Sequence, residues 1–418
     1  MSVKILPLSE ERILSLASKV PTPFHLYDGD AIERNAEEMK KAFAWAPSFI
    51  NYFAVKALPN INILKLLKKH GFGADCSSLP ELLMSREAGI DGCNVMFTSN
   101  DTPDEEFRAA YDMGAILNLD DITHIESVKR AVGFLPKTIS FRFNPGPERT
   151  GNAIIGNPVE AKYGLTRHQL FDAYRIAKEE GVEHFYLHTM VASNELNESY
   201  IVETARMLFS LVIEIKDKTG VEIEAVDLGG GVGIPYKESD QPIEWKKLGD
   251  DIHALYCEMI EKKGLKPLRI SFECGRAITG PYGYLISRVR HVTHKYKDYV
   301  GLDACMADLM RPALYGSYHH ITVIGKKSLP KDHIYDVTGS LCENNDKFAI
   351  DRALPEIDEG DLIAIHDTGA HGFAMGFNYN GKMRHAEYLL SSGHIYKIRR
   401  EETYDDYVRT QLLKPEEI

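Results

Sequence analysis

INYFAVKALPNINILKLLKKHGFGADCSS, residues 50–78, joins two short apolar runs through an amphipathic segment. The runs at 50–56 and 72–78 have the length and composition of buried strands. Between them, apolar residues recur at three- and four-residue spacing until Gly71, which is typical of a helix that packs one face on a core. The stretch therefore predicts a strand, a helix and a second strand in that order.

The same alternation continues along the chain to about residue 275. The eight strand candidates are INYFAVK (50–56), FGADCSS (72–78), NVMFTSN (94–100), AILNLDD (115–121), TISFRFN (138–144), HFYLHTM (184–190), EAVDLGG (224–230) and RISFECG (269–275). Strands that alternate with helices imply a parallel sheet, and eight such units are the number that closes a (β/α)8 TIM barrel. A doubly wound open sheet is the alternative, and we favour the barrel.

A change of composition after about residue 280 predicts a second domain. Segments such as YGYLISRVRHVTHKYKDYV (282–300) and HAEYLLSSGHIYKIRR (385–400) are rich in Val, Ile and Tyr and are broken by Gly and Asp. This composition is typical of antiparallel strands. We therefore expect an α/β barrel domain over residues 25–280 and a β-rich, Greek-key-like barrel or sandwich built from residues 1–24 and 281–418.

The composition disfavours several classes of protein. The chain has 418 residues, a formal net charge of −12 and 26% charged residues, so nucleic acid and anionic membranes are not expected as partners. Six cysteines without a CxxC pair suggest neither a metal site nor a disulfide framework. No leader peptide and no apolar run of the roughly 18 residues that cross a membrane are recognisable. We expect a cytoplasmic protein with reduced thiols.

Lys56 ends the first apolar strand, where a charged group needs an explanation. Catalytic groups of a TIM barrel stand at the carboxyl ends of its strands, and all eight strand candidates end in polar, charged or glycine residues. A lysine in a desolvated site has a lowered pKa and can form a Schiff base. The alternative is a lysine that only forms an ion pair or extends to solvent.

Two further motifs end the last two strands. DLGGGVGIPY (227–236) contains a glycine turn whose backbone N–H groups can approach a phosphate, although a tight β–α turn explains it equally well. The motif matches neither a Walker loop nor a dinucleotide fingerprint. FECGRAITGPYG (272–283) combines an acid with a glycine and an arginine. The acid can hold a ring nitrogen protonated, or it can form only a surface pair with the arginine.

Two motifs of the second domain contain groups suited to an amino-acid ligand. DACMADLMRPALYGSYHH (303–320) contains Arg311 and Tyr315, and a guanidinium fork suits a carboxylate. SLCENNDKFAIDR (340–352) places Cys342 beside Glu343, a proton donor beside an amine ligand. Taken alone, a solvated arginine and an inert loop cysteine are the simpler interpretations.

The order of seven motifs resembles one known family. YFAVKALPN, HTMVAS, DLGGGVGIPY, FECGRAITG, DACMADLMRPALYGSYH, GSLCENNDKFAIDR and DTGAHGFAMGFNYNGKMR follow one another as in the diaminopimelate decarboxylases. These enzymes use pyridoxal 5'-phosphate and share the alanine-racemase-like fold with ornithine decarboxylase. The resemblance covers about residues 22–400. It implies this cofactor, a barrel with a β-domain, and a homodimer that shares its active sites at the interface.

The resemblance also implies roles for single residues. Lys56 matches the Schiff-base lysine, Glu273 matches the partner of the pyridine nitrogen, and Cys342 matches a proton donor from the other subunit. The expected cofactor-binding residues are Lys56, Asp75, His188, Met190, Ser193, Gly230, Gly231, Glu273, Cys274, Gly275, Arg276 and His371. The expected substrate-binding residues are Arg276, Arg311, Tyr315, Glu343 and His371, and the expected catalytic residues are Lys56 and Cys342.

The chain departs from the family pattern at three positions. Met190 replaces the histidine that stacks on the cofactor ring, and either its thioether or His188, on the same strand face, is a substitute. Cys274 replaces a proline that has no polar role. His371 replaces a tyrosine that touches cofactor or substrate, and a histidine titrates near neutral pH. These changes bear on the substrate and the pH optimum more than on the chemistry.

The activity implied by the resemblance is decarboxylation of the small diamino acid meso-2,6-diaminopimelate to L-lysine, the last step of lysine biosynthesis. Three alternatives remain open: a decarboxylase of another basic amino acid such as D- or L-ornithine or lysine, a racemase, and a non-catalytic cofactor-binding homologue. Arg311 favours a substrate with a distal carboxylate. Glu273 disfavours a racemase, because racemases of this fold place an arginine beside the pyridine nitrogen.

Overall fold

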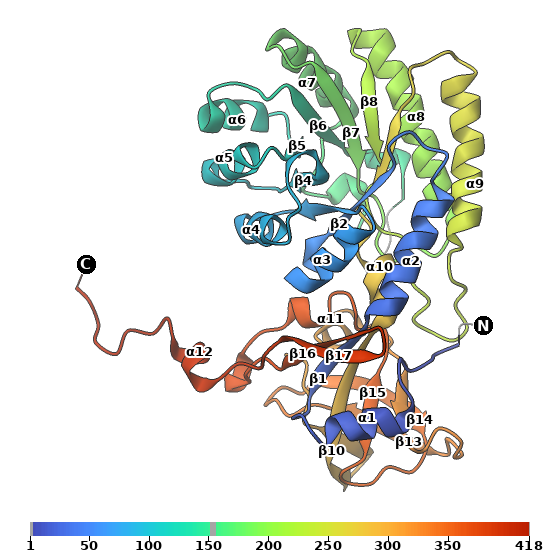
Figure 1. Cartoon of the computed structure of the whole chain (residues 1–418), viewed down its shortest axis with the longest axis vertical. Helices are drawn as coiled ribbons and strands as arrows, with labels where there is room; N and C mark the ends of the chain where they lie inside the picture. Colours follow the sequence, from blue (N-terminus) through green and yellow to red (C-terminus); the bar gives the residue numbers. More distant parts are fainter. Residues whose placement is uncertain (1–2, 151–155, 418) are drawn as a thin grey trace. The chain divides into compact units, whose positions relative to one another are not determined.

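The chain forms two compact units, and the computed structural model describes residues 3–150 and 156–417 (Figure 1). One unit comprises Ile32–Pro235 and Gln241–Ile278, and the other comprises Met1–Ala31, Tyr236–Asp240 and Thr279–Ile418. The domain limits inferred from the sequence, near residues 24 and 280, stay a prediction.

In the described part of the first unit, eight parallel strands close into a barrel, which confirms the predicted TIM barrel over the open sheet. The strands are β2 (Ile50–Ala54), β3 (Gly73–Cys76), β4 (Val95–Thr98), β5 (Ile116–Leu119), β6 (Thr138–Phe143), β7 (His184–Thr189), β8 (Ile223–Asp227) and β9 (Arg269–Phe272). Each overlaps one of the apolar runs of the sequence. Pairing of β9 with β2 closes the ring.

Helices surround the barrel (Figure 1). They are α2 (Gly29–Ala42), α3 (Ile61–Lys69), α4 (Leu79–Glu87), α5 (Asp104–Asp112), α6 (His124–Val132), α7 (Arg167–Glu179), α8 (Glu198–Thr219) and α9 (Trp245–Tyr256). Local signals fix their ends. The side chain of Asn60 caps α3, and Gly133 and Gly220 end α6 and α8 in the left-handed conformation. No helix in the described ranges is long and apolar enough to cross a membrane.

Within the described residues of the second unit, nine strands form one mixed sheet, so the predicted separate β-rich domain is confirmed. The strands are β1 (Phe24–Asp28), β10 (Gly283–His294), β11 (Asp298–Leu302), β12 (Ile321–Val323), β13 (His333–Thr338), β14 (Lys347–Leu354), β15 (Leu362–Ile365), β16 (Ala386–Ser391) and β17 (His394–Arg399). The short helices of this unit are α1 (Glu10–Ala17), α11 (Arg311–Tyr315) and α12 (Tyr404–Val408).

The composition of this domain predicted antiparallel strands, but two of the strand pairs are parallel. Strand β1 pairs with β16 in parallel, and β11 pairs with β13 in parallel. An apolar run in the sequence indicates a strand, but it does not indicate which strand pairs with it or in which direction. Since most of the chain separates β1 from β16, no hairpin turn fixes their relative direction.

Candidate active site

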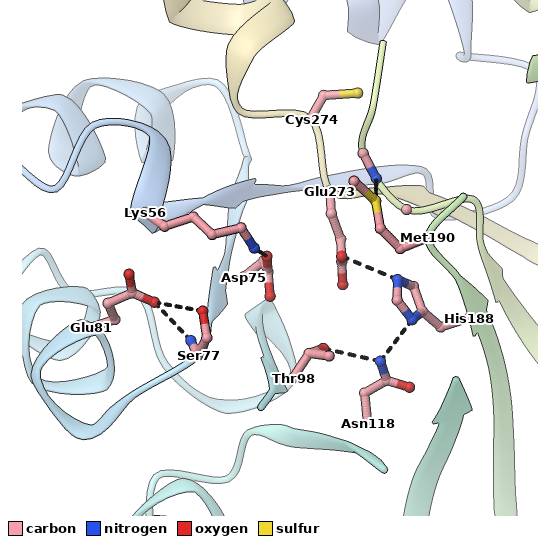
Figure 2. A network of polar contacts seen from close by, with 12 residues as sticks. Lys56, Asp75, Ser77, Glu81, Thr98, Asn118, His188, Met190, Glu273 and Cys274 are labelled. Carbon is pink, nitrogen blue, oxygen red and sulfur yellow. Dashed lines mark hydrogen bonds and ion pairs between the residues drawn. The ribbon is translucent and has the colours of Figure 1, made fainter. Parts of the chain in front are cut away.

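Lys56 lies at the carboxyl rim of the barrel, in the short turn Val55–Ala57 that follows β2 directly. The strand is buried throughout, whereas the lysine side chain keeps 54% of its exposure. Its Nζ donates a hydrogen bond to Oδ2 of Asp75 at 3.0 Å (Figure 2). The apolar strand thus carries the lysine to the mouth of the barrel, where the buried carboxylate of the neighbouring strand β3 holds it.

The charge of Asp75 raises the pKa of Lys56 above its usual value, and the charge of Glu273 adds to this effect. The sequence predicted a lowered pKa for Lys56, on the basis of desolvation. That prediction is wrong for the protein without cofactor, because the ion pair with Asp75 has a larger effect on the pKa than burial does. Burial raises the pKa of Asp75 to about 6. Lys56 is an ammonium group at neutral pH and must pass on a proton before its nitrogen can attack a carbonyl carbon.

Glu273 is buried directly after β9 and is anchored by His188 of β7 (Figure 2). His188 Nε2 lies 3.1 Å from Glu273 Oε2, and His188 Nδ1 lies 2.9 Å from the side-chain nitrogen of Asn118. Because an amide nitrogen only donates, His188 accepts at Nδ1 and carries its hydrogen on Nε2, directed at Glu273. Burial lowers the pKa of His188 to about 4, so the ring is neutral at physiological pH.

The second oxygen of Glu273 is available to a ligand. Oε1 is buried and makes no hydrogen bond within the described residues. Burial raises the pKa of Glu273, whereas the positive charges of Lys56 and Arg142 oppose this shift. A buried carboxylate oxygen without a donor is costly, so a ligand N–H at this position would stabilise the site.

The glycine turn after β8 packs closely on the segment that follows β7. Gly229 and Gly231 have φ values of 70° and 94°, and a Cβ on them would lie 2.2 and 2.5 Å from the carbonyl oxygens of Thr189, at the end of β7, and of Ala192. Only glycine fits such positions. The N–H of Gly230 points at the sulfur of Met190 at 3.3 Å. The turn therefore lies tightly against the end of β7 and the residues after it, with Met190 beside it.

The loop after β9 packs against the start of the barrel. The backbone N–H and carbonyl of Cys274 bond to the side chain of Asn51 at 2.9 and 3.1 Å. Burial raises the pKa of the Cys274 thiol, so this residue is an uncharged space-filling group. A Cβ on Gly275 would lie 2.6 Å from the Cβ of Ala57. This close approach brings the end of β9 beside the lysine turn.

The structure brings most of the predicted cofactor site together in one unit. The predicted residues that follow or end the barrel strands are Lys56, Asp75, His188, Met190, Ser193, Gly230, Gly231, Glu273, Cys274, Gly275 and Arg276. At one edge of this group, the guanidinium of Arg276 donates to the hydroxyl of Ser193 at 3.5 Å. The individual roles of these residues stay predictions.

The remaining predicted site residues belong to the second unit. Arg311 is buried, and its guanidinium donates to the hydroxyl of Tyr236 at 2.6 Å. His371 has a left-handed backbone conformation with a φ of 56°. Three further residues have exposed side chains: Tyr315, Cys342 and Glu343. Their substrate-binding and proton-donating roles stay predictions.

Sequence reasoning missed the polar residues beneath the rim. Asn118 interrupts the apolar strand β5 and fixes the tautomer of His188. Asp227 ends β8 and accepts the N–H of Gly229 at 2.7 Å. A lone polar residue inside an apolar run was the available signal in both cases. No metal site was expected, yet His188, Asp227 and Glu273 each offer one ligand atom within 4.8 Å of the others, an arrangement that also suits a metal ion.

Replacing Asp227 by asparagine is expected to make stability less sensitive to pH. Burial raises the pKa of Asp227 to about 7, and the charge of Glu273 adds to it. The folded state thus retains a proton that the unfolded chain loses near pH 4. Stability therefore falls as the pH rises from about 4 to about 7, by at most about 1.4 kcal/mol per pH unit for one group.

Urea unfolding of Asp227→Asn across this pH range should show a shallower decline in the free energy of unfolding. The exposed Asp250 provides a matched control, since Asp250→Asn should keep the wild-type slope. An unchanged slope in Asp227→Asn would contradict the raised pKa.

The geometry fits pyridoxal phosphate. The buried Oε1 of Glu273 can accept a ring N–H, and the amine of Lys56 lies at the same rim of the barrel. Residues 29–280 match the family model of the pyridoxal-binding domain of pyridoxal-dependent decarboxylases. The chain belongs to this family of enzymes, which are carboxy-lyases, and its cofactor is pyridoxal 5'-phosphate.

Particular relatives span nearly the whole chain. Protein TabA of Pseudomonas amygdali pv. tabaci is 40% identical over 97% of this chain and 93% of its own length. A diaminopimelate decarboxylase of Methanothermobacter thermautotrophicus is 33% identical over 95% of this chain and 93% of its own. The crystal structure of the diaminopimelate decarboxylase of M. jannaschii in complex with L-lysine has a TM-score of 0.90 and 30% identity, and covers 96% of this chain and 95% of that one.

Proposed function

We propose that this protein decarboxylates meso-2,6-diaminopimelate to L-lysine and CO2 in the cytoplasm. The observation that carries the proposal is the rim arrangement, with Lys56 paired to Asp75 beside a buried Glu273 that has one oxygen without a partner among the described residues. Relatives named diaminopimelate decarboxylases, one of them in complex with L-lysine, support this substrate. We also propose residues 25–280, and 1–24 with 281–418, as the two functional domains.

We propose roles in holding the cofactor from the resemblance to the family and from the chemistry of the residues. Lys56 Nζ would bond to its aldehyde carbon, and Glu273 Oε1 would accept its ring N–H. The groups that would hold its phosphate are Ser193 and the backbone of Gly230, Gly231, Gly275 and Arg276. When bound, the cofactor supplies a protonated ring that draws off the electron pair left on carbon as CO2 departs.

Lys56 and Cys342 would move the protons. The ammonium of Lys56 must lose a proton before it bonds, and Asp75 Oδ2, at 3.0 Å, is the adjacent acceptor. With a pKa of about 6, Asp75 exchanges protons near neutral pH more readily than an ordinary aspartate. Cys342 of the partner subunit would then protonate the carbon that lost CO2. The residues that would bind the distal end of the substrate are Arg276, Arg311, Tyr315, Glu343 and His371.

Turnover of the cofactor-loaded enzyme tests the proposal directly. Meso-diaminopimelate, lysine and ornithine, the last two as both enantiomers, would be supplied separately, with CO2 release and chiral product analysis as readouts. CO2 and L-lysine from meso-diaminopimelate are expected. Faster release from ornithine or lysine would instead identify a decarboxylase of another basic amino acid, an alternative that Met190 and His371 keep open. Inverted substrate without CO2 would identify a racemase, and no turnover at all would indicate a non-catalytic homologue.

Mixing two inactive variants should restore activity if a homodimer shares its active sites, as we propose. Lys56→Ala removes the cofactor-bonding amine of one subunit, and Cys342→Ala removes the proton donor contributed by the other. A heterodimer then has one intact site, so random association gives about a quarter of wild-type activity. The measurement is CO2 release after co-expression of the two variants. Lack of recovery in a sample that contains heterodimers would contradict shared sites.

A further inference from the structure

A cavity of about 380 Å³ in the second unit is lined by arginine side chains. Most of its lining residues lie just before β16, at the end of β17, and in or beside α12, elements that Figure 1 labels. The four arginines are Arg384, Arg399, Arg400 and Arg409. Like charges repel one another at such short range, so a cluster of this kind needs either compensating carboxylates or a bound anion.

Two of the arginines lie over one aromatic ring. The guanidinium carbons of Arg384 and Arg399 are 4.0 and 4.7 Å from the ring centroid of Phe373. Arg384 also donates to the backbone oxygen of Phe373, but its Nε is buried and makes no hydrogen bond within the described residues. Burial lowers the pKa of Arg384, although the charges of Asp308, Glu402 and Glu387 oppose this shift. The Arg384 guanidinium is therefore desolvated without full compensation.

Two of the nearby carboxylates pair with Arg399 and Arg400, and none of them pairs with Arg384 or Arg409 in the described residues. Asp406 binds both terminal nitrogens of Arg400, at 2.5 and 2.8 Å. Glu402 Oε2 accepts the backbone N–H of Arg384 and a side-chain amide, each at 2.8 Å, rather than a guanidinium. Glu387 is buried behind Arg399 and binds its Nε.

The exposed Arg409 makes no ion pair with any residue in the described ranges. Four arginines and two carboxylates, Glu402 and Asp406, line the cavity, while the charges of Asp308 and Glu387 also act on Arg384. Positive charge is therefore in excess in the lining of the cavity, and within the described residues neither Arg384 nor Arg409 forms an ion pair with a carboxylate.

We propose that this cavity binds a small multivalent oxyanion, such as a phosphate or a polycarboxylate. Guanidinium forks bind such groups through paired N–H donors, and a partly buried site strengthens each contact. The cavity is larger than inorganic phosphate, so the oxyanion group of a larger metabolite also fits. The site lies entirely in the second unit, and the proposal does not depend on the substrate of the barrel.

Thermal unfolding of the cofactor-loaded enzyme tests this site, because bound cofactor already fills the predicted phosphate cradle at the barrel. Phosphate and citrate would be titrated separately against sodium chloride of equal ionic strength. We expect a saturable rise of roughly 2 °C in Tm beyond the chloride effect. A response to phosphate alone identifies a phosphate site, and a response to citrate identifies a polycarboxylate site.

Three single variants test whether the anion-dependent rise in Tm arises at this cavity. Arg384→Gln should abolish it and Arg409→Gln should weaken it several-fold, whereas Arg206→Gln on α8 of the barrel should leave it unchanged. Because Arg409 is exposed, Arg409→Gln should fold. It therefore still tests the site if Arg384→Gln does not fold. The proposal is overturned if neither anion exceeds chloride, or if Arg409→Gln responds as the wild type does.

Discussion

Lys56→Ala is expected to lower kcat for CO2 release at least about 10³-fold, because it removes the only covalent bond proposed between protein and cofactor, together with a proton carrier at the rim. The visible absorbance of cofactor joined to a lysine should disappear as well. Unfolding would not explain such a loss. The side chain is half exposed, so alanine leaves no core cavity, and Asp75, with its pKa near 6, can take up a proton when its partner is removed.

Two further variants separate the bond from the ion pair. Lys56→Arg keeps a cation beside Asp75 but cannot form the bond, so its activity should be as low as that of Lys56→Ala. Lys65→Ala, at an exposed position of α3, should retain wild-type kcat. Activity of Lys56→Ala within tenfold of wild type, or an active Lys56→Arg, would refute the role proposed for Lys56.

The barrel could be predicted because its signals are local. Each strand is a short apolar run, each helix has its own periodicity, and Gly71, Gly133 and Gly220 mark helix ends within the sequence itself. The position of Lys56 follows from the same signals, since the end of a barrel strand faces the rim whichever strands flank it. The pKa of Lys56 does not follow, because it depends on a carboxylate nineteen residues away on the next strand.

The network beneath the rim was beyond sequence reasoning for a related reason. Asn118 and His188 come from two different strands and Glu273 follows a third, so the chain of hydrogen bonds exists only once the barrel closes. Strand direction in the second unit is non-local in the same way. The apolar run at β1 predicts a strand, but its parallel pairing with β16 is decided by tertiary packing.

Glu273→Gln is expected to lower kcat about 10²- to 10³-fold, with a much smaller change in KM. The glutamine oxygen can still accept the N–H of His188, so the side chain should stay in place. Its amide nitrogen, however, would then face the ligand as a donor. A donor at that position favours an unprotonated ring nitrogen, which cannot draw electrons from the reacting carbon as a protonated one does.

Stability measurements distinguish a lower kcat in Glu273→Gln from a loss of folded protein. Burial raises the pKa of Glu273, so its carboxylate lowers the free energy of unfolding as the pH rises above the ordinary pKa of a glutamate, and an uncharged glutamine should leave that free energy equal or higher at alkaline pH. Glu224→Gln, at an exposed position of β8, should change neither kcat nor stability. A slow but fully folded Glu273→Gln enzyme that still binds cofactor would assign the loss to the ring nitrogen. Wild-type kcat in this variant would instead mean that the orphaned oxygen of Glu273 serves the fold rather than the reaction.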